Sequence, residues 1–326
     1  MITDPLPRVP LAQLPTPVTR LTRLTSLMGG AELWIKRDDQ TGLAFGGNKT
    51  RKLEFLLADA EMRGARTLVT RGAVQSNHCR QTAAAAAAHG LQSILVLRGD
   101  PPDSVNGNLF LDRLLGARLV WTHGRDPELV LQEAVARAEA DSLRPYLVPY
   151  GGSSPLGACA YAAALEEALA QCPSPEWMVL ASSSGGTQAG LVAGARLLGY
   201  PGKILGMSVD LPGPELRAKV APLASEVCAL LGRATSIREG EILVEDRFAT
   251  AGYAVVTDLE RSAVSAFAQQ EGILLDPVYT GRAAGGMLTL AREGFFRAGE
   301  TVLFWHTGGT PALFAFSEVL KGLDAR

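Results

Sequence analysis

A lysine at an unusual place is the strongest chemical signal in the chain. Lys49 follows two glycines and an asparagine, and apolar residues then recur with helical spacing, which predicts a helix over 50–62. At or near the helix N-terminus, the helix dipole and partial burial would both favour the neutral, nucleophilic amine. The alternative is an ordinary solvated basic run with Arg51 and Lys52.

A second polar cluster, Gln-Ser-Asn-His at 75–78, follows the strand-like run 67–70 and precedes an alanine-rich helix predicted over 79–89. Polar side chains at such a strand-to-helix turn point into the crevice at the carboxyl end of a parallel sheet. Ser76 and Asn77 are therefore candidate site residues, with plain helix capping as the alternative role.

A turn rich in serine and glycine, 182–187, follows the strand-like run 177–181 and opens another predicted helix. Free backbone N–H groups and hydroxyls at a helix start bind anions, and phosphate is the usual one. The turn lacks the P-loop lysine pattern and the spacing of a dinucleotide fingerprint, so one small phosphate fits better than a nucleoside triphosphate. Together with a reactive Lys49, this cup indicates pyridoxal 5'-phosphate, bound as an imine to the lysine amine.

Five motifs, in order over nearly the whole chain, carry a resemblance to a known family. They are Gly-Gly-Asn-Lys-Thr-Arg-Lys-Leu-Glu-Phe (46–55), Gln-Ser-Asn-His (75–78), Ser-Gly-Gly-Thr-Gln-Ala-Gly (184–190), Asp-Pro-Val-Tyr-Thr-Gly (276–281) and His-Thr-Gly-Gly-Thr-Pro-Ala-Leu (306–313). The sequence resembles the family of 1-aminocyclopropane-1-carboxylate (ACC) deaminases and D-cysteine desulfhydrases.

The resemblance implies a role for each matching residue. Lys49 would be the imine lysine and later the base that moves the α-proton, while Asn77 would hydrogen-bond the phenolic oxygen of the cofactor. Ser76 would lie near the substrate α-carbon and carboxylate, and His78 would pack nearby or support the site residues rather than act as a catalytic residue. The phosphate cup would consist of Ser184, Gly185, Gly186 and Thr187.

Two tyrosines match family positions close to the substrate. Tyr279 is the stronger candidate, while for Tyr253 a catalytic role and core packing stay equally open. A phenol beside a cationic imine would lose its proton below its usual pKa of ~10 and serve as acid, base or nucleophile.

Two departures from the ACC deaminase pattern bear on the substrate. That branch has Glu and Leu where this sequence has Thr280 and Thr307. A threonine cannot hold a proton on the pyridine nitrogen as a glutamate does, so the electron sink is weaker and suits elimination of a good leaving group. The resemblance therefore implies α,β-elimination of D-cysteine to pyruvate, ammonia and hydrogen sulfide, with ACC ring opening as an alternative.

L-cysteate sulfo-lyases look similar at the same two positions and remain a further alternative. A sulfonate would need a fixed cation in the pocket, for which Arg80 and Arg282 are candidates. Two other classes of protein are alternatives. A pyridoxal phosphate carrier without turnover has no need of the proton-transfer set, and a metal-dependent lyase lacks ligand spacing among the four histidines.

Composition agrees with a small soluble enzyme. With 326 residues, 47% hydrophobic content and a net charge of -2, the chain has no electrostatic footprint for nucleic acid or for an anionic membrane. The four cysteines show no metal or CxxC spacing, and no signal or membrane-spanning pattern is present, so we expect a reduced, cytoplasmic protein. The resemblance implies a homodimer.

Strand-like and helix-like runs alternate along the chain, which predicts an α/β fold with doubly wound parallel sheets covered by helices on both faces. The expected strands are 67–70, 93–97, 118–121, 146–148, 177–181, 204–209 and 301–305, and the expected further helices are 104–115, 127–140, 156–171, 187–198, 258–271 and 281–297. The resemblance implies fold type II of pyridoxal phosphate enzymes, as in the tryptophan synthase β subunit. A small α/β domain, 50–153, would be inserted in a large cofactor-binding domain formed by 1–49 and 154–326.

Overall fold

A computed structural model describes residues 1–172 and 174–321, and its larger sheet has six strands. Only the edge strand β1 is antiparallel to its neighbour, and the other pairs are parallel. In spatial order the strands are β1 (Val18–Arg20), β2 (Glu32–Arg37), β10 (Thr301–His306), β7 (Trp177–Ser182), β8 (Lys203–Ser208) and β9 (Leu243–Glu245).

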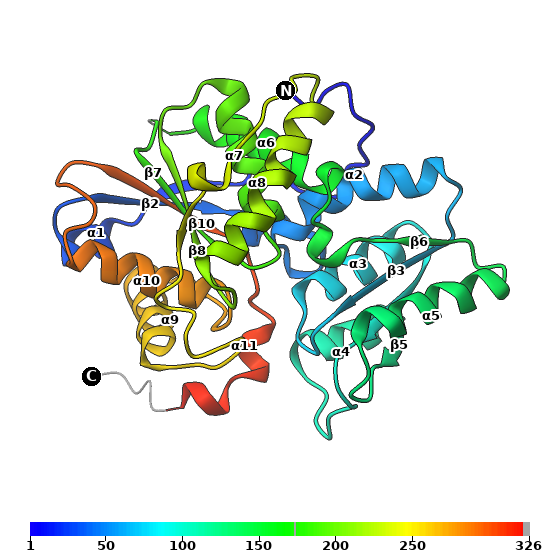
Figure 1. Ribbon diagram of the computed structural model, residues 1–326. Helices are drawn as coiled ribbons and strands as arrows, with labels where there is room; N and C mark the ends of the chain where they lie inside the picture. Colours follow the sequence, from blue (N-terminus) through cyan, green and yellow to red (C-terminus); the bar gives the residue numbers. More distant parts are fainter. Residues whose placement is uncertain (173, 322–326) are drawn as a thin grey trace.

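The smaller sheet is wholly parallel and forms a separate lobe (Figure 1). In spatial order its strands are β5 (Arg118–Trp121), β4 (Gln92–Leu97), β3 (Thr67–Gly72) and β6 (Pro145–Leu147). All four lie within the predicted inserted segment 50–153. The division into two domains, as units that fold separately, stays a prediction.

Helices join the strands and cover the sheets. They are α1 (Thr22–Met28), α2 (Asn48–Met62), α3 (Asn77–Ala88), α4 (Gly107–Leu114), α5 (Pro127–Ala140), α6 (Pro155–Leu169), α7 (Gly186–Leu198), α8 (Gly213–Leu230), α9 (Asp258–Glu271), α10 (Thr280–Arg292) and α11 (Ala312–Ala315). Within the described residues, none of these helices combines the length and the apolar character needed to cross a bilayer.

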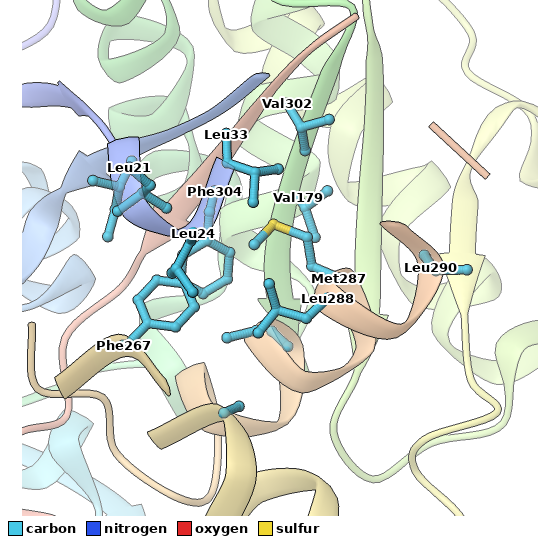
Figure 2. Close-up of a cluster of buried hydrophobic side chains, with 14 of the residues drawn as sticks. Leu21, Leu24, Leu33, Val179, Phe267, Met287, Leu288, Leu290, Val302 and Phe304 are labelled. Carbon is cyan, nitrogen blue, oxygen red and sulfur yellow. The ribbon is translucent and has the colours of Figure 1, made fainter. Parts of the chain in front are cut away.

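Side chains alternate between the two faces of the larger sheet along its strands, and helices cover both faces, so both are buried. On one face, Val179 and Phe304 pack with Phe267 of α9 and Met287 of α10 (Figure 2). On the other face, Trp305 and its neighbours pack against α6 and α7. Helices on both faces of a parallel sheet confirm the doubly wound class.

Candidate active site

The backbone that carries Lys49 is fixed from both sides. Helix α2 begins at Asn48, two residues before the predicted start, and Lys49 is its second residue, so it lies near the helix N-terminus as the sequence predicted. The N–H of Asn48 donates to the carbonyl of Thr307 at 2.9 Å, and Gly47 has φ 124, a conformation that favours glycine. Burial lowers the pKa of Lys49 to about 8, so a substantial fraction of its amine is neutral near physiological pH.

A buried ion pair anchors the first turn of α2. The guanidinium of Arg51 donates to both carboxylate oxygens of Asp38, at 2.8 and 3.0 Å. Tyr161 and Trp305 also donate to Asp38, at 2.6 and 2.8 Å. Because the carboxylate accepts from four side chains, the fourth being Thr16 at 2.8 Å, the position of Lys49 relative to the larger sheet is well defined.

The predicted phosphate cup lies at the start of α7, facing Lys49. Gly185 has φ 82, which turns the chain so that the N–H groups of the first helical turn are free of helix bonds. Thr187 accepts a hydrogen bond from Asn48 Nδ2 at 3.0 Å, so its own hydroxyl proton remains free to donate. Ser184 Oγ lies 2.9 Å from Ser153 Oγ, which in turn accepts from the N–H of Gly186 at 3.2 Å.

Sequence reasoning missed two residues of this cup, Lys52 and Ser153. The amine of Lys52 is buried and donates to the carbonyl of Gly151 at 3.1 Å, and a Cβ added at Gly186 would lie 2.9 Å from it. Burial and the nearby charge of Lys49 hold the pKa of Lys52 well below its usual value. Lys52 follows Lys49 by one helical turn, on the same side of α2, and that i, i+3 spacing was the available signal.

The opposite wall is the start of α3. Ser76 caps this helix by accepting from the N–H of Cys79 at 3.2 Å, and Asn77 is its first residue. His78 lies 2.8 Å from Thr70, whose hydroxyl proton is already donated to Val148. His78 must therefore donate from Nε2, which leaves the Nδ1 lone pair without a partner among the described residues.

His78 also stays neutral. Burial and the charges of Lys49 and Lys52 keep its pKa well below the usual value. His78 is among the residues that line the cavity, and its expected role in packing or in supporting the site stays a prediction.

The two candidate tyrosines form a pair. Tyr279 lines the cavity and Tyr253 lies beside it, with their hydroxyl oxygens 2.9 Å apart. Burial raises the pKa of both phenols above 10. In the protein by itself, removing a phenolate from water outweighs the neighbouring dipoles, and the lowered tyrosine pKa expected beside a cationic imine stays a prediction.

Only one of the two diagnostic threonines faces the cavity. Thr307 is among its lining residues, whereas Thr280 is fully buried beneath it and is not. The Thr280 hydroxyl donates to Asp276 Oδ1 at 2.8 Å and accepts from the Asp276 N–H at 2.9 Å. The single hydroxyl proton is thus already donated, so the predicted contact of Thr280 with the pyridine nitrogen, which would accept that proton, has no support in this geometry.

Neither arginine weighed as a sulfonate ligand reaches the cavity. Arg80 donates to Gly46, Asn77 and Asn108. Arg282 donates to Glu260 at 2.6 Å and to three backbone carbonyls. Their guanidinium groups are therefore committed inside the protein.

The cavity brings most of the predicted residues together. Within the described part of the chain, its lining contains no carboxylate, and Lys49 is its one lysine or arginine. The lining residues are Asn48, Lys49, Ser76, Asn77, His78, Tyr150, Gly151, Ala181, Ser182, Ser183, Ser184, Gly185, Thr187, Tyr279, Thr307 and Gly308. No group of three or more His, Cys, Asp or Glu side chains suited to a metal ion is found among residues 1–172 and 174–321.

Comparison with known proteins agrees with this arrangement. Residues 9–308 match the family model described as pyridoxal-phosphate dependent enzyme. A D-cysteine desulfhydrase of Salmonella typhi is 41% identical over 319 residues, covering 95% of this chain and 96% of that protein. A D-cysteine desulfhydrase of Yersinia enterocolitica is 42% identical with the same coverage.

Solved structures give the same result. The crystal structure of an ACC deaminase homologue superposes with a TM-score of 0.92 at 36% identity, covering 99% of this chain and 98% of that one. A threonine deaminase isoform of Solanum lycopersicum, with a TM-score of 0.67 at 16% identity and coverage of 95% and 83%, shares the fold alone. The predicted fold type, cofactor and family are thereby confirmed, and the chain belongs to the family of pyridoxal-phosphate dependent enzymes.

Proposed function

We propose that this enzyme eliminates the thiol of D-cysteine, giving pyruvate, ammonia and hydrogen sulfide with uptake of the water that hydrolyses the product imine. One observation carries the proposal: a lysine of lowered pKa and an anion cup face each other across a cavity whose described lining has no carboxylate and no second lysine or arginine. Relatives of about 40% identity that carry the name D-cysteine desulfhydrase support it.

The residues present fit pyridoxal phosphate. Free N–H groups at the start of α7, the Thr187 hydroxyl and the Lys52 amine would hold the phosphate. Lys49 would hold the aldehyde carbon and Asn77 the phenolic oxygen. When bound, the cofactor supplies an electron-withdrawing ring that takes up the electron pair left at the substrate α-carbon.

The protein side of the reaction then needs three roles. The neutral amine of Lys49 accepts the α-proton, since its pKa lies near the operating pH. The Ser76 hydroxyl and the start of α3 orient the substrate carboxylate. Tyr279, protonated because its pKa is raised, donates a proton to the departing sulfur, and Tyr253 orients that phenol.

The same cavity argues against the two alternative substrates. A sulfonate would lie buried without a fixed cation, because Lys49 is already assigned to the cofactor and both arginines are engaged elsewhere. Ring opening of ACC would lack a carboxylate to hold a proton on the pyridine nitrogen, since no Asp or Glu is among the lining residues described.

A substrate panel tests the proposal. Purified enzyme should release pyruvate and sulfide from D-cysteine, with little sulfite from L-cysteate and little 2-oxobutanoate from ACC. Preference for L-cysteate or ACC would overturn the substrate assignment. A cofactor spectrum without turnover on any D- or L-amino acid would favour the carrier alternative.

Three broader expectations also stand as proposals: an inserted domain at 50–153, a cytoplasmic location and a homodimer. The four cysteines are free thiols, which suits a reducing compartment. Exposed apolar side chains on neighbouring helices, Phe110 and Leu114 of α4 and Phe314 of α11, support a self-association surface. Light scattering that gives a monomer mass would contradict the dimer.

A further inference from the structure

A chain of buried polar side chains lies directly behind Asn77. Arg80 Nη1 donates to Asn108 Oδ1 at 2.9 Å and to Asn77 Oδ1 at 3.2 Å. Asn108 Nδ2 donates to Asn77 Oδ1 at 2.9 Å and to the backbone carbonyl of Gln75 at 2.9 Å. Arg80 and Asn108 are both fully buried, so neither exchanges these partners with water.

The hydrogen-bond partners determine the orientation of both carboxamides, those of Asn108 and Asn77. An arginine only donates, so the atom of Asn108 that faces it must be the carbonyl oxygen. A backbone carbonyl only accepts, so the atom of Asn108 that faces Gln75 must be the amide nitrogen. Asn77 therefore receives two hydrogen bonds on one atom, which must be its oxygen, and its amide nitrogen is the group left for the cavity.

We infer that Arg80 and Asn108 are positioning residues that lock the Asn77 carboxamide with its N–H donors toward the cofactor. This rests on the proposed contact between Asn77 and the phenolic oxygen of pyridoxal phosphate. A free carboxamide can present either its oxygen or its nitrogen, and only the nitrogen can donate to a phenolate. The lock removes the wrong orientation before the cofactor arrives.

Arg80 also joins this lock to the segment that carries Lys49. Its Nη2 donates to the carbonyl of Gly46 at 2.7 Å, in a turn where Phe45, Gly46 and Gly47 all have positive φ. The same guanidinium therefore fixes the turn before the lysine and the amide on the opposite wall. The carboxylates of Asp112 and Asp276 act on the charge of Arg80, and its hydrogen bond to Asn77 Oδ1 polarises that amide, which strengthens the donor character of the amide N–H groups.

The substitution Asn108→Asp tests the orientation with almost no change in shape. Aspartate still accepts from Arg80 but cannot donate to Asn77, so the Asn77 amide should rotate to donate to the new carboxylate and present its oxygen to the cavity. Asn106→Asp is the matched control, since it adds the same charge two residues away without touching Asn77. Asn108→Ala removes the donor without adding charge.

Cofactor affinity of the apoprotein, measured by fluorescence titration, should fall ~10- to 100-fold in Asn108→Asp, less in Asn108→Ala and little in Asn106→Asp. The pH midpoint of the visible absorption of the holoenzyme should rise in the same order, because a phenolate that loses its donor binds a proton more tightly. Thermal melting of each apoprotein identifies a variant that has merely lost its fold.

A double-mutant cycle separates this inference from the proposed role of Asn77. If Asn77→Ala leaves cofactor affinity unchanged, the contact of Asn77 with the cofactor is wrong. If Asn77→Ala weakens binding while folded Asn108→Asp binds normally, the contact stands and the lock is wrong. In the Asn77→Ala background, Asn108→Asp should have no further effect, and an additive loss would also refute the lock.

Discussion

The hydroxyl oxygens of Tyr253 and Tyr279 lie 2.9 Å apart, with ring centroids 6.0 Å apart in an edge-to-face arrangement. Arg282 holds the loop of Tyr253 by donating to the carbonyls of Gly252 and Val255 at 2.9 and 2.7 Å. Because burial raises the pKa of both phenols, both hydroxyls keep their protons at neutral pH. We propose that Tyr279 faces the substrate and that Tyr253 orients it.

The pair predicts unequal effects of removing each hydroxyl. Tyr279→Phe should reduce kcat on D-cysteine by roughly 10²- to 10⁴-fold, the usual contribution of a positioned general acid. Tyr253→Phe should reduce it by about tenfold or less, since the Tyr279 proton remains. Steady-state sulfide release measures both, and equal losses in the two variants would contradict the division of roles.

The lowered pKa of Lys49 predicts a pH dependence for cofactor attachment. Only the neutral amine attacks the aldehyde, and its fraction reaches one half at a pH of about 8 and levels off only above that pH. Stopped-flow mixing of apoprotein with pyridoxal phosphate should show an attachment rate that rises with pH and is half-maximal at a pH of about 8. A midpoint near 10.5, as for a solvated lysine, would show that the amine is not desolvated.

Covalent trapping then identifies the lysine. Borohydride should fix the cofactor to the peptide that contains Lys49, and Lys49→Ala should abolish this labelling. Lys203→Met, at an exposed lysine, is the matched control. Labelling that persists in Lys49→Ala would move the attachment site to another lysine.

The phosphate cup predicts a difference between two cofactor forms. Thr187→Val should weaken binding of pyridoxal phosphate by about 1 to 3 kcal/mol, the cost of one hydrogen bond to a charged group. Lys52→Met should weaken it further, because the buried amine beside Gly186 supplies further hydrogen-bond donors to the phosphate. Pyridoxal, which lacks the phosphate, should bind both variants as it binds wild type, and a parallel loss of pyridoxal affinity would place the phosphate elsewhere.

The elements that position the site were predictable from local pattern. Apolar runs that end in small polar residues mark most of these elements in the sequence. They include the helix after Lys49, the strand-to-helix turns at 75–78 and 182–187, and the strands of the smaller sheet. The helix expected over 281–297 ends at Arg292 instead, where Gly294 has φ +73 and breaks it.

Long-range features were not predictable in this way. Strand β2 lies between β1 and β10 in the larger sheet, yet it contains the buried Lys36, whose partner Glu167 is far along the chain. Helix α8 was hidden by Pro212, Pro214 and Pro222, which read as breakers although the helix accommodates Pro222. The roles of Lys52 and Ser153 likewise depend on segments that meet only after folding.

The buried ion pair between Arg51 and Asp38 predicts how the free energy of unfolding falls in acid. The guanidinium of Arg51 lowers the pKa of Asp38 from 3.8 to about 2, although burial by itself would raise it. A lowered pKa stabilises the fold above pH 4, and this contribution, about 2 kcal/mol, is lost as pH falls toward 2. Denaturant unfolding of Asp38→Asn should show a flatter pH dependence over that range, whereas Asp103→Asn, at an exposed loop, should retain the wild-type slope.

The last prediction concerns Thr280, which differs from the glutamate of the ACC deaminase pattern. From the sequence, Thr280→Glu with Thr307→Leu should supply a proton-holding carboxylate and switch the enzyme toward ring opening. The structure predicts another outcome, because Asp276 already accepts from the N–H groups of Val278, Tyr279 and Thr280 and from the Thr280 hydroxyl. A glutamate carboxylate at this buried position would lie beside that of Asp276, with no cation paired to either of them among the described residues.

Thr280→Glu should therefore lower the free energy of unfolding by more than about 2 kcal/mol and reduce cofactor binding before it alters the reaction. Thr280→Ser keeps the hydroxyl and both of its hydrogen bonds, so it should melt and turn over D-cysteine like wild type. Thr307→Leu faces the cavity and should affect turnover without a comparable loss of stability. A stable Thr280→Glu protein that gains 2-oxobutanoate release from ACC would contradict this prediction. The glutamate side chain would then reach past Asp276 into the cavity, and the residue at position 280 would determine the substrate.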